Sequence, residues 1–176
     1  RAFGEHNVRN ALAAAAATSS AGIGVDAVRA GLESFRPVKG RLELKRSRCG
    51  AILLDDTYNA NPDSVRAAID VLAHASGPRV LVLGDMGEVG AKGAEFHAEI
   101  GRYARESGIE RLFAVGELAR ESVAAFGRDA EHFDSTEAMA PAIDGVLGAT
   151  STVLVKGSRF MRMERVVAGL EGAACC

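Results

Sequence analysis

The chain has 176 residues, of which 48% are hydrophobic and 25% are charged, a composition typical of a folded domain rather than of a disordered segment. Its 23 acidic and 21 basic residues give a formal net charge of −2, which disfavours a globally basic nucleic-acid-binding protein. Only three cysteines occur, at 49, 175 and 176, so we expect a cytoplasmic protein without a disulfide framework, with Cys175 and Cys176 in a frayed tail.

The N-terminal part shows neither a membrane span nor a signal peptide. Its alanine-rich uncharged stretch, residues 11–25, has 15 residues, shorter than a membrane span requires. That stretch is rich in alanine and poor in strong hydrophobes, which argues against a signal peptide. Because the sequence begins with Arg1 and not with Met, we expect it to be a piece of a longer protein.

Two helices and a boundary are predicted at the start of the chain. Residues 7–17 are alanine-rich and favour a helix, and residues 25–35 place apolar side chains on one side of a second helix. Pro37 and Gly40 follow and interrupt regular structure. We therefore expect one domain to end at residue 36 and a second to cover residues 37–176.

The second domain is expected to open with a β-hairpin. Residues 41–45 and 51–55 read as strands around a turn at 47–50, and the cations between Lys39 and Arg48 are expected to be a solvated edge. Asn61 is a good N-cap and Pro62 suits the first helical position, so a helix should begin there and end near Gly77.

Strands and helices then alternate to the end of the chain. Short apolar strands between amphipathic helices predict an α/β fold, a Rossmann-like and mostly parallel sheet with helices on both faces. The N-terminal β-hairpin would form its edge, and a short helical remnant of another domain would precede it. All strand-to-helix loops should then lie at one edge of the sheet, where such folds bind ligands. The expected strands are 80–83, 112–115, 131–133 and 152–155, and the expected helices are 94–106, 117–126, 136–147 and 161–170.

The first segment at that edge is Asp-Asp-Thr-Tyr-Asn-Ala-Asn-Pro at 55–62. It combines carboxylates at a strand end, where we expect Asp56 to be solvated, with amides at a helix N-terminus. An aspartate here could hold a ribose hydroxyl, a metal-bound water or an amine. The alternative is turn and capping chemistry, which for Asn61 alone is equally strong.

The second segment is the glycine-rich Gly-Asp-Met-Gly-Glu-Val-Gly at 84–90. It matches neither G-x-G-x-x-G nor G-x-x-x-x-G-K-[ST], and by itself it predicts a flexible loop, with His97 on the following helix opposite it. The four histidines lack ligand spacing and Cys49 has no neighbouring partner, so we expect no metal site in this chain.

The third segment is Lys-Gly-Ser-Arg at 156–159, followed by Arg162. We expect Arg159 in the first turn of the last helix, where a cation opposes the helix dipole and an anionic ligand would reverse the cost. The alternative is a set of solvated surface arginines.

Taken together and in order, these segments resemble the Mur ligases, the ATP-dependent amide-forming enzymes of peptidoglycan synthesis. The resemblance runs from about Gly4 to Leu170. It includes Gly-Glu-His-Asn-Val-Arg-Asn-Ala-Leu at 4–12 and Gly-Arg-Leu-Glu at 40–43 as well as the segments described above.

The resemblance implies a three-domain enzyme that binds a UDP-sugar, ATP and an amino substrate. Residues 1–36 would be the last helices of the central ATP-binding domain, and residues 37–176 the C-terminal domain for the amino substrate. ATP would convert the carboxylate of UDP-N-acetylmuramoyl-tripeptide to an acyl phosphate, which the amine of D-alanyl-D-alanine attacks. Mg²⁺ would be held mainly by the central domain, and the chain, lacking the P-loop, should be inactive alone.

The resemblance also implies roles for particular residues, in a monomer that binds neither nucleic acid nor membrane. Asp56 would be catalytic and would contact ATP. The other expected ATP-binding residues are Asn7, Asn10 and Arg41. The expected substrate-binding residues are Asn59, Asn61, Lys156, Ser158 and Arg159.

Two other functions are open. One is a stand-alone Rossmann-like nucleotide-binding module without catalysis. The other is a different ligase of the same superfamily, such as a folylpolyglutamate synthase, against which the segment at 55–62 argues.

Overall fold

The computed structural model describes residues 4–36 and 38–172, with the backbone alone at residues 5 and 6. The chain divides into two compact units, Arg1–Val38 and Lys39–Cys176, called here the helical unit and the sheet unit. Pro37, expected to end the second helix, and the expected tail cysteines at 175 and 176 lie outside the described residues.

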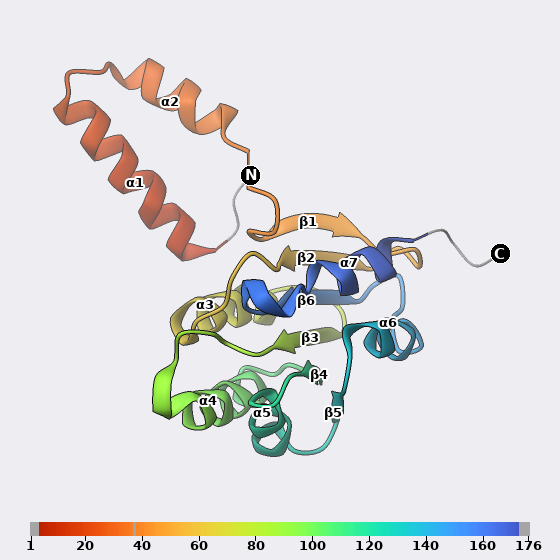
Figure 1. Cartoon of the computed structure of the whole chain (residues 1–176). Coiled ribbons are helices and arrows are strands. Elements are labelled where there is room, and N and C mark those ends of the chain that lie inside the picture. Colours follow the sequence, from red (N-terminus) through yellow and green to blue (C-terminus); the bar gives the residue numbers. More distant parts are fainter. Residues whose placement is uncertain (1–3, 37, 173–176) are drawn as a thin grey trace. The chain divides into compact units, whose positions relative to one another are not determined.

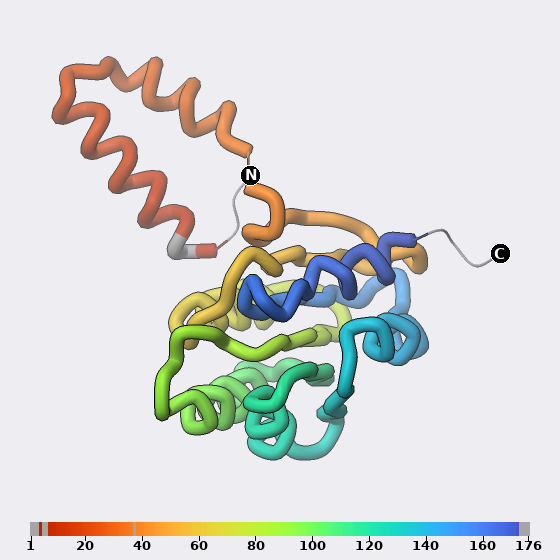
Figure 2. The backbone as a smooth tube through the Cα atoms, in the orientation of Figure 1, coloured from red at the N-terminus to blue at the C-terminus, as the bar shows by residue number. Residues whose placement is uncertain are grey.

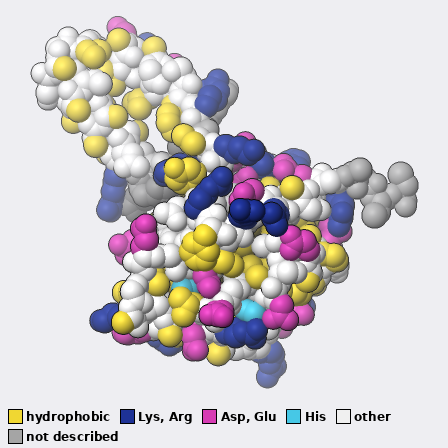
Figure 3. Space-filling view, in the orientation of Figure 1, with side chains coloured by type: hydrophobic (Ala, Val, Ile, Leu, Met, Phe, Trp, Pro, Cys, Tyr) yellow, Lys and Arg dark blue, Asp and Glu magenta, His cyan; other side chains and the backbone are white. Residues whose placement is uncertain are grey.

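The helical unit consists of α1 (Glu5–Ser20) and α2 (Val25–Ser34), which pack side by side as a hairpin (Figure 1). Gly22 turns the chain between them with a φ of 81°, a conformation that glycine adopts without strain. None of this unit's described side chains is buried. Its large exposed apolar residues are Val8, Leu12, Ile23, Val25, Leu32, Phe35 and Val38, and Figure 3 shows hydrophobic side chains at the surface of this unit.

The sheet unit contains a six-stranded sheet in the order β1-β2-β6-β3-β4-β5. β1 pairs with β2 antiparallel, and the other neighbours pair in parallel. The predicted hairpin and mostly parallel Rossmann-like sheet are therefore confirmed. The strands are β1 (Glu43–Arg46), β2 (Ile52–Asp56), β3 (Arg79–Gly84), β4 (Arg111–Val115), β5 (Ala130–Phe133) and β6 (Thr152–Lys156).

Helices cover both faces of this sheet, as the chain path in Figure 2 shows. α3 (Pro62–Ala73), α4 (Gly93–Glu106) and α5 (Ala119–Phe126) pack on one face around Leu81 and Leu154. α6 (Thr136–Asp144) and α7 (Glu164–Glu171) pack on the other around Val82 and Val155. The central strands are continuously apolar because neither face meets water, and each fully buried Leu or Val side chain contributes roughly 1.5–3 kcal/mol. No helix among the described residues is long and apolar enough to cross a membrane.

The last helix begins later than the sequence predicts. Residues 159–161 form a separate 3₁₀ turn, η2 (Arg159–Met161), and Arg162 then adopts a left-handed φ of 51°. A left-handed residue cannot continue a helix, so α7 starts only at Glu164, whose carboxylate suits a helix N-terminus. The expectation that Arg159 lies in the first turn of the last helix is therefore wrong.

Parallel pairing brings three strand ends to one edge of the sheet. Asp56 at the end of β2 lies opposite Lys156 at the end of β6, and Lys156 lies opposite Leu83 of β3. Gly157 lets β3 and β6 approach each other here, because a Cβ at this position would lie 3.1 Å from the Cα of Gly84 and 2.6 Å from the Cγ of Met163. The loops after β2, β3 and β6 therefore converge.

Candidate functional site

An ion pair between Asp56 and Lys156 lies at the centre of the converging loops. The Lys156 Nζ is 2.5 Å from the Asp56 Oδ2, and the two side chains are 4% and 13% exposed. The Asp56 Oδ1 also accepts the Leu42 N–H at 3.1 Å. The expected solvated carboxylate at position 56 is therefore wrong, because a cation from the neighbouring strand covers it.

Lys156 also fixes the loop after β2. Its Nζ donates to the Asn59 carbonyl at 3.0 Å, so one ammonium group bridges the end of that strand and the loop that follows it. Asn59 itself is exposed. The Asn61 side chain accepts the Ser64 N–H at 2.8 Å, and Ser64 reciprocates in a capping box, so the predicted N-cap of α3 is confirmed.

Asp55 points to the opposite face of the sheet and has different partners. Its carboxylate accepts the Thr57 hydroxyl at 2.7 Å and lies 3.1 Å from the Lys45 Nζ. Lys45 also contacts Glu171 of α7 at 3.3 Å. Burial alone would lower the pKa of Lys45, but Asp55 and Glu171 outweigh it and raise this pKa above its ordinary value. Lys45 is thus not the solvated edge cation that the sequence predicts.

Ser158, in the loop after β6, connects the loops after β2 and β3. Its Oγ accepts the Gly87 N–H and donates to the Ala60 carbonyl at 3.0 Å. Its N–H donates to the Asp85 carbonyl, also at 3.0 Å. The expectation of a merely flexible glycine-rich loop is therefore wrong, because Ser158 and the buried His97 ring accept hydrogen bonds from the backbone of residues 86 and 87.

Arg41 and Tyr58 stack next to the Asp56–Lys156 pair. The Arg41 guanidinium carbon lies 4.3 Å from the centre of the Tyr58 ring, a distance at which a cation and an aromatic face attract each other. Gly40, with a φ of 72°, accepts the Tyr58 N–H through its carbonyl at 2.9 Å. Both side chains are exposed and available to a ligand.

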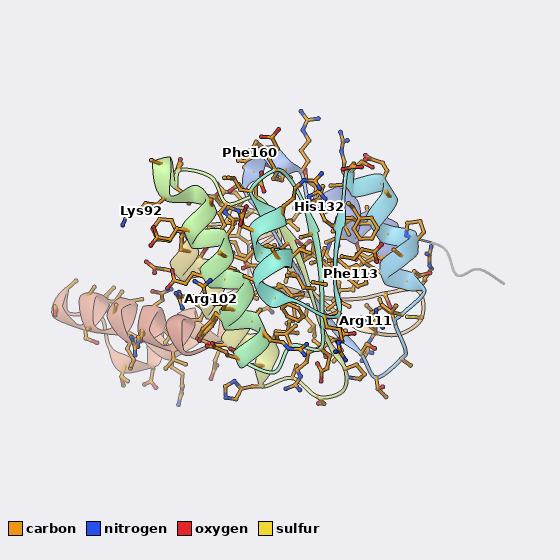
Figure 4. The ribbon with its side chains drawn as sticks, turned by 90° about the horizontal axis from the view of Figure 1, so that it is seen from below. Lys92, Arg102, Arg111, Phe113, His132 and Phe160 are labelled. Atoms are coloured by element: carbon orange, nitrogen blue, oxygen red, sulfur yellow. The ribbon has the colours of Figure 1, made fainter. Side chains whose placement is uncertain are left out.

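Arg159 and Phe160 lie on η2 at the same edge of the sheet unit. The Arg159 side chain is 69% exposed and its nearest carboxylate oxygen, on Glu164, is 3.7 Å away. Phe160 is 65% exposed, and Figure 4 shows it at the end of the unit opposite Arg111, where β4 begins. The two remaining sequence candidates, Asn7 and Asn10, lie on α1 of the helical unit.

The structure thus brings together Arg41, Asp56, Asn59, Lys156, Ser158 and Arg159 of the predicted set. Sequence reasoning missed two residues that hold the site's loops, Asp85 and Tyr58, and gave His97 little weight. Their signal was position alone, since Asp85 follows an apolar strand and Tyr58 follows the paired aspartates. Among the described residues no group of three or more His, Cys, Asp or Glu could hold a metal ion.

An open, mostly parallel sheet with helices on both faces and loops that converge at one edge defines a Rossmann-like α/β domain. The family model described as "Mur ligase, glutamate ligase domain" matches residues 40–159. This chain belongs to the Mur ligase family.

Within that family, the chain is similar to ligases of one kind. The chain is 42% identical over 175 residues to the UDP-N-acetylmuramoyl-tripeptide–D-alanyl-D-alanine ligase of Escherichia coli, covering 98% of this chain and 38% of that protein. Among solved structures, MurF from Acinetobacter baumannii superposes with a TM-score of 0.87 at 35% identity, covering 96% of this chain and 38% of that one. MurF ligase from Thermotoga maritima, in complex with ADP, superposes with a TM-score of 0.86 at 26% identity, covering 97% and 39%. The chain therefore spans well under half the length of these relatives.

Proposed function

We propose that this chain is the C-terminal, amino-substrate-binding part of a cytoplasmic, monomeric ATP-dependent ligase. That enzyme would add D-alanyl-D-alanine to UDP-N-acetylmuramoyl-tripeptide. The name and extent of the E. coli relative support this assignment. Residues 1–36 would then be the last helices of a central ATP-binding domain, and residues 37–176 the C-terminal domain.

The arrangement of cations at the sheet edge is the observation that carries the proposal. Arg159 is exposed and only loosely engaged by Glu164, so its planar guanidinium can receive a carboxylate through two hydrogen bonds. We assign it the carboxylate of D-alanyl-D-alanine. Ser158 and the loop carrying Asn59 and Asn61, which Lys156 anchors, would form the walls around the dipeptide.

The nucleotide would meet a second part of this edge. Arg41 is exposed and faces solvent above Tyr58, which suits a phosphate or ribose contact. Asp56 accepts the N–H of Leu42, the residue after Arg41. Asn7 and Asn10 of α1 would contact the adenine. Because the buried Lys156 holds the Asp56 carboxylate in place, Asp56 would contact the nucleotide with a carboxylate in a fixed position.

The proposed reaction proceeds through an acyl phosphate. ATP transfers its γ-phosphoryl group to the tripeptide carboxylate, and the dipeptide amine attacks the acyl carbon. A C–N bond forms, phosphate leaves with the electron pair of the C–O bond, and the amine proton passes to phosphate or water. This chain's residues would bind the dipeptide carboxylate and orient the amine.

Mg²⁺ is implied by the resemblance but does not fit the described residues. The one carboxylate at the centre of the edge, Asp56, already bonds Lys156 and the Leu42 N–H. The described residues contain no group of three or more His, Cys, Asp or Glu that could hold a metal ion. We therefore assign the ion to the rest of the enzyme.

A chimera tests the proposal. This chain replaces the matching segment of the E. coli ligase, and phosphate release is measured with ATP, UDP-N-acetylmuramoyl-tripeptide and D-alanyl-D-alanine. Release should require all three compounds and should not occur with L-alanyl-L-alanine. Arg159→Lys keeps the charge and loses the paired donors, so it should raise the KM for the dipeptide about tenfold, equivalent to about 1.4 kcal/mol, and leave the KM for ATP unchanged. A folded chimera without dipeptide-dependent release argues against the assignment.

Calorimetry on the chain alone tests the nucleotide-binding alternative. We expect weak or no ATP binding, since the chain contains no P-loop sequence. A dissociation constant near 1 μM, about −8 kcal/mol, would instead favour a stand-alone nucleotide-binding module.

A further inference from the structure

His97 is a fully buried titratable residue that the proposed function leaves without a role. It lies on α4 with 0% of its surface exposed, and both ring nitrogens have backbone partners. The Nε2 lies 2.9 Å from the Met86 nitrogen and the Nδ1 lies 2.7 Å from the Gly93 carbonyl oxygen. A backbone N–H can only donate, so Nε2 must be the acceptor. The proton therefore resides on Nδ1, and the ring is neutral in a single tautomer.

The bond from Met86 places this imidazole directly behind the candidate site. On one side of Met86, the Asp85 carbonyl accepts the Ser158 N–H. On the other side, the Gly87 N–H donates to the Ser158 Oγ, which itself donates to the Ala60 carbonyl. Hydrogen bonds joined through the backbone of residues 85–87 thus connect His97 to the loop that carries Asn59 and Asn61.

The helix that carries His97 is itself held rigidly. The Ser122 hydroxyl of α5 donates to the His97 carbonyl at 2.7 Å. The Asp85 carboxylate accepts the N–H of Ala119, the first residue of α5, at 2.8 Å and lies 3.8 Å from the His97 Nε2. Gly101 lets α4 and α5 approach closely, because a Cβ there would lie 2.2 Å from the Ser122 carbonyl oxygen. The acceptor offered to Met86 is therefore in a fixed position.

We propose that His97 is a positioning residue, whose neutral imidazole sets the backbone at 85–87 so that Ser158 can bridge the loops of the amino-substrate site. That the site binds the amino substrate rests on the proposed function, whereas the hydrogen bonds that hold the loops together do not depend on it. Removing the acceptor would leave the buried Met86 N–H without a partner, and the loop would move or open to satisfy it.

Three variants of the full chain separate positioning from general core stability. His97→Leu removes the acceptor and keeps an apolar side chain of similar size. His97→Gln can present its Oε1 to Met86 and should restore the bond in part. Ser122→Ala is the matched control, because it removes a buried hydrogen bond from the same α4–α5 contact without touching the loop.

Amide hydrogen exchange provides a readout that needs no ligand. In His97→Leu, exchange at Met86, Gly87 and Ser158 should accelerate by about tenfold or more while core amides such as Val153 are unaffected. His97→Gln should recover part of this protection, and Ser122→Ala should lower the Tm without the local effect. Equal local effects in His97→Leu and Ser122→Ala, or none in His97→Leu, would overturn the proposal.

Two further measurements guard against a variant that fails to fold and against failure of the proposed function. In the wild-type chain, ¹⁵N NMR should find the His97 proton on Nδ1, and a proton on Nε2 would overturn the inference. In the chimera, His97→Gln should raise the KM for D-alanyl-D-alanine more than it lowers kcat. If the wild-type chimera does not use the dipeptide, the proposed function fails, while the exchange and tautomer data still decide the role of His97.

Discussion

Apolar side chains have opposite surroundings in the two units of this chain. In the sheet unit Leu81 and Leu154 are completely buried, whereas in the helical unit Leu12 and Leu32 are 65% and 42% exposed. Both units nevertheless form regular helices. Local propensity is enough to form a helix, but its stability comes from burying its apolar side. Among the residues that the structure describes, only those of the sheet unit bury such side chains.

The largest expected effect comes from separating the units. A peptide of residues 1–38 should be mostly unfolded in water, because helices of 16 and 10 residues without a buried face are marginal. Residues 39–176 should retain a cooperative thermal transition. Far-UV circular dichroism of both pieces checks this, and loss of the transition in residues 39–176 would contradict the division.

Matched leucine substitutions sharpen the comparison. Leu154→Ala should lower the free energy of unfolding of the sheet unit by roughly 3–5 kcal/mol, since it leaves a cavity on the face of the sheet that α3, α4 and α5 cover. Leu12→Ala should change it by less than about 0.5 kcal/mol. Urea unfolding of both variants measures the difference, and equal losses would show that α1 belongs to the same core.

The Asp56–Lys156 pair is expected to have the next largest effect. Asp56→Ala leaves a buried ammonium group without its partner and should cost about 3 kcal/mol. This expectation reverses the one that the sequence alone suggests, in which a solvated Asp56 helps little with folding. Asp56→Leu combined with Lys156→Met should recover much of that loss, and the exposed Arg159→Ala serves as the control. An unchanged Tm in Asp56→Ala would contradict this expectation and would mean that the pair does not stabilise the fold.

The smallest expected effect is a dependence of stability on acid pH, which comes from the pair of Glu110 and Arg79, the first residue of β3. Burial alone would raise the pKa of Glu110, but hydrogen bonds and charge from Arg79 outweigh it and lower this pKa. The resulting stabilisation is complete above the unfolded-state value of about 4.3 and is lost as pH falls through the lower folded-state value. Glu110→Gln should therefore reduce the fall in Tm below about pH 4.3. Identical acid profiles for variant and wild type would assign that fall to other carboxylates.

Much of the fold was predictable because its signals are local. Apolar strands, amphipathic helices and the Asn61-Pro62 cap each lie within a few adjacent residues, and parallel pairing then fixes the edge at which Asp56 and Lys156 emerge. The start of α7 was mispredicted because a left-handed Arg162 leaves no mark in the apolar spacing.

The state of the site residues depends on contacts that local sequence does not contain. Lys156 covers Asp56 because β6 inserts between β2 and β3, an order that the chain sequence does not state. The His97–Met86 bond requires a particular angle between α4 and the loop after β3. The roles of these residues toward a ligand stay predictions.

The paired aspartates also bear on how β2 finds its place during folding. The strand reads Ile-Leu-Leu-Asp-Asp, so a shift by one residue would still present apolar side chains to both faces and an aspartate to Lys156. Hydrophobic patterning therefore discriminates poorly between the native and the shifted alignment. Lys45 favours the native alignment, because its Nζ there lies 3.1 Å from the Asp55 carboxylate, whereas a shift of β2 that brings Asp55 to the place of Asp56 would put Leu54 opposite Glu43. An edge lysine thereby helps to set which of two neighbouring carboxylates pairs with Lys156.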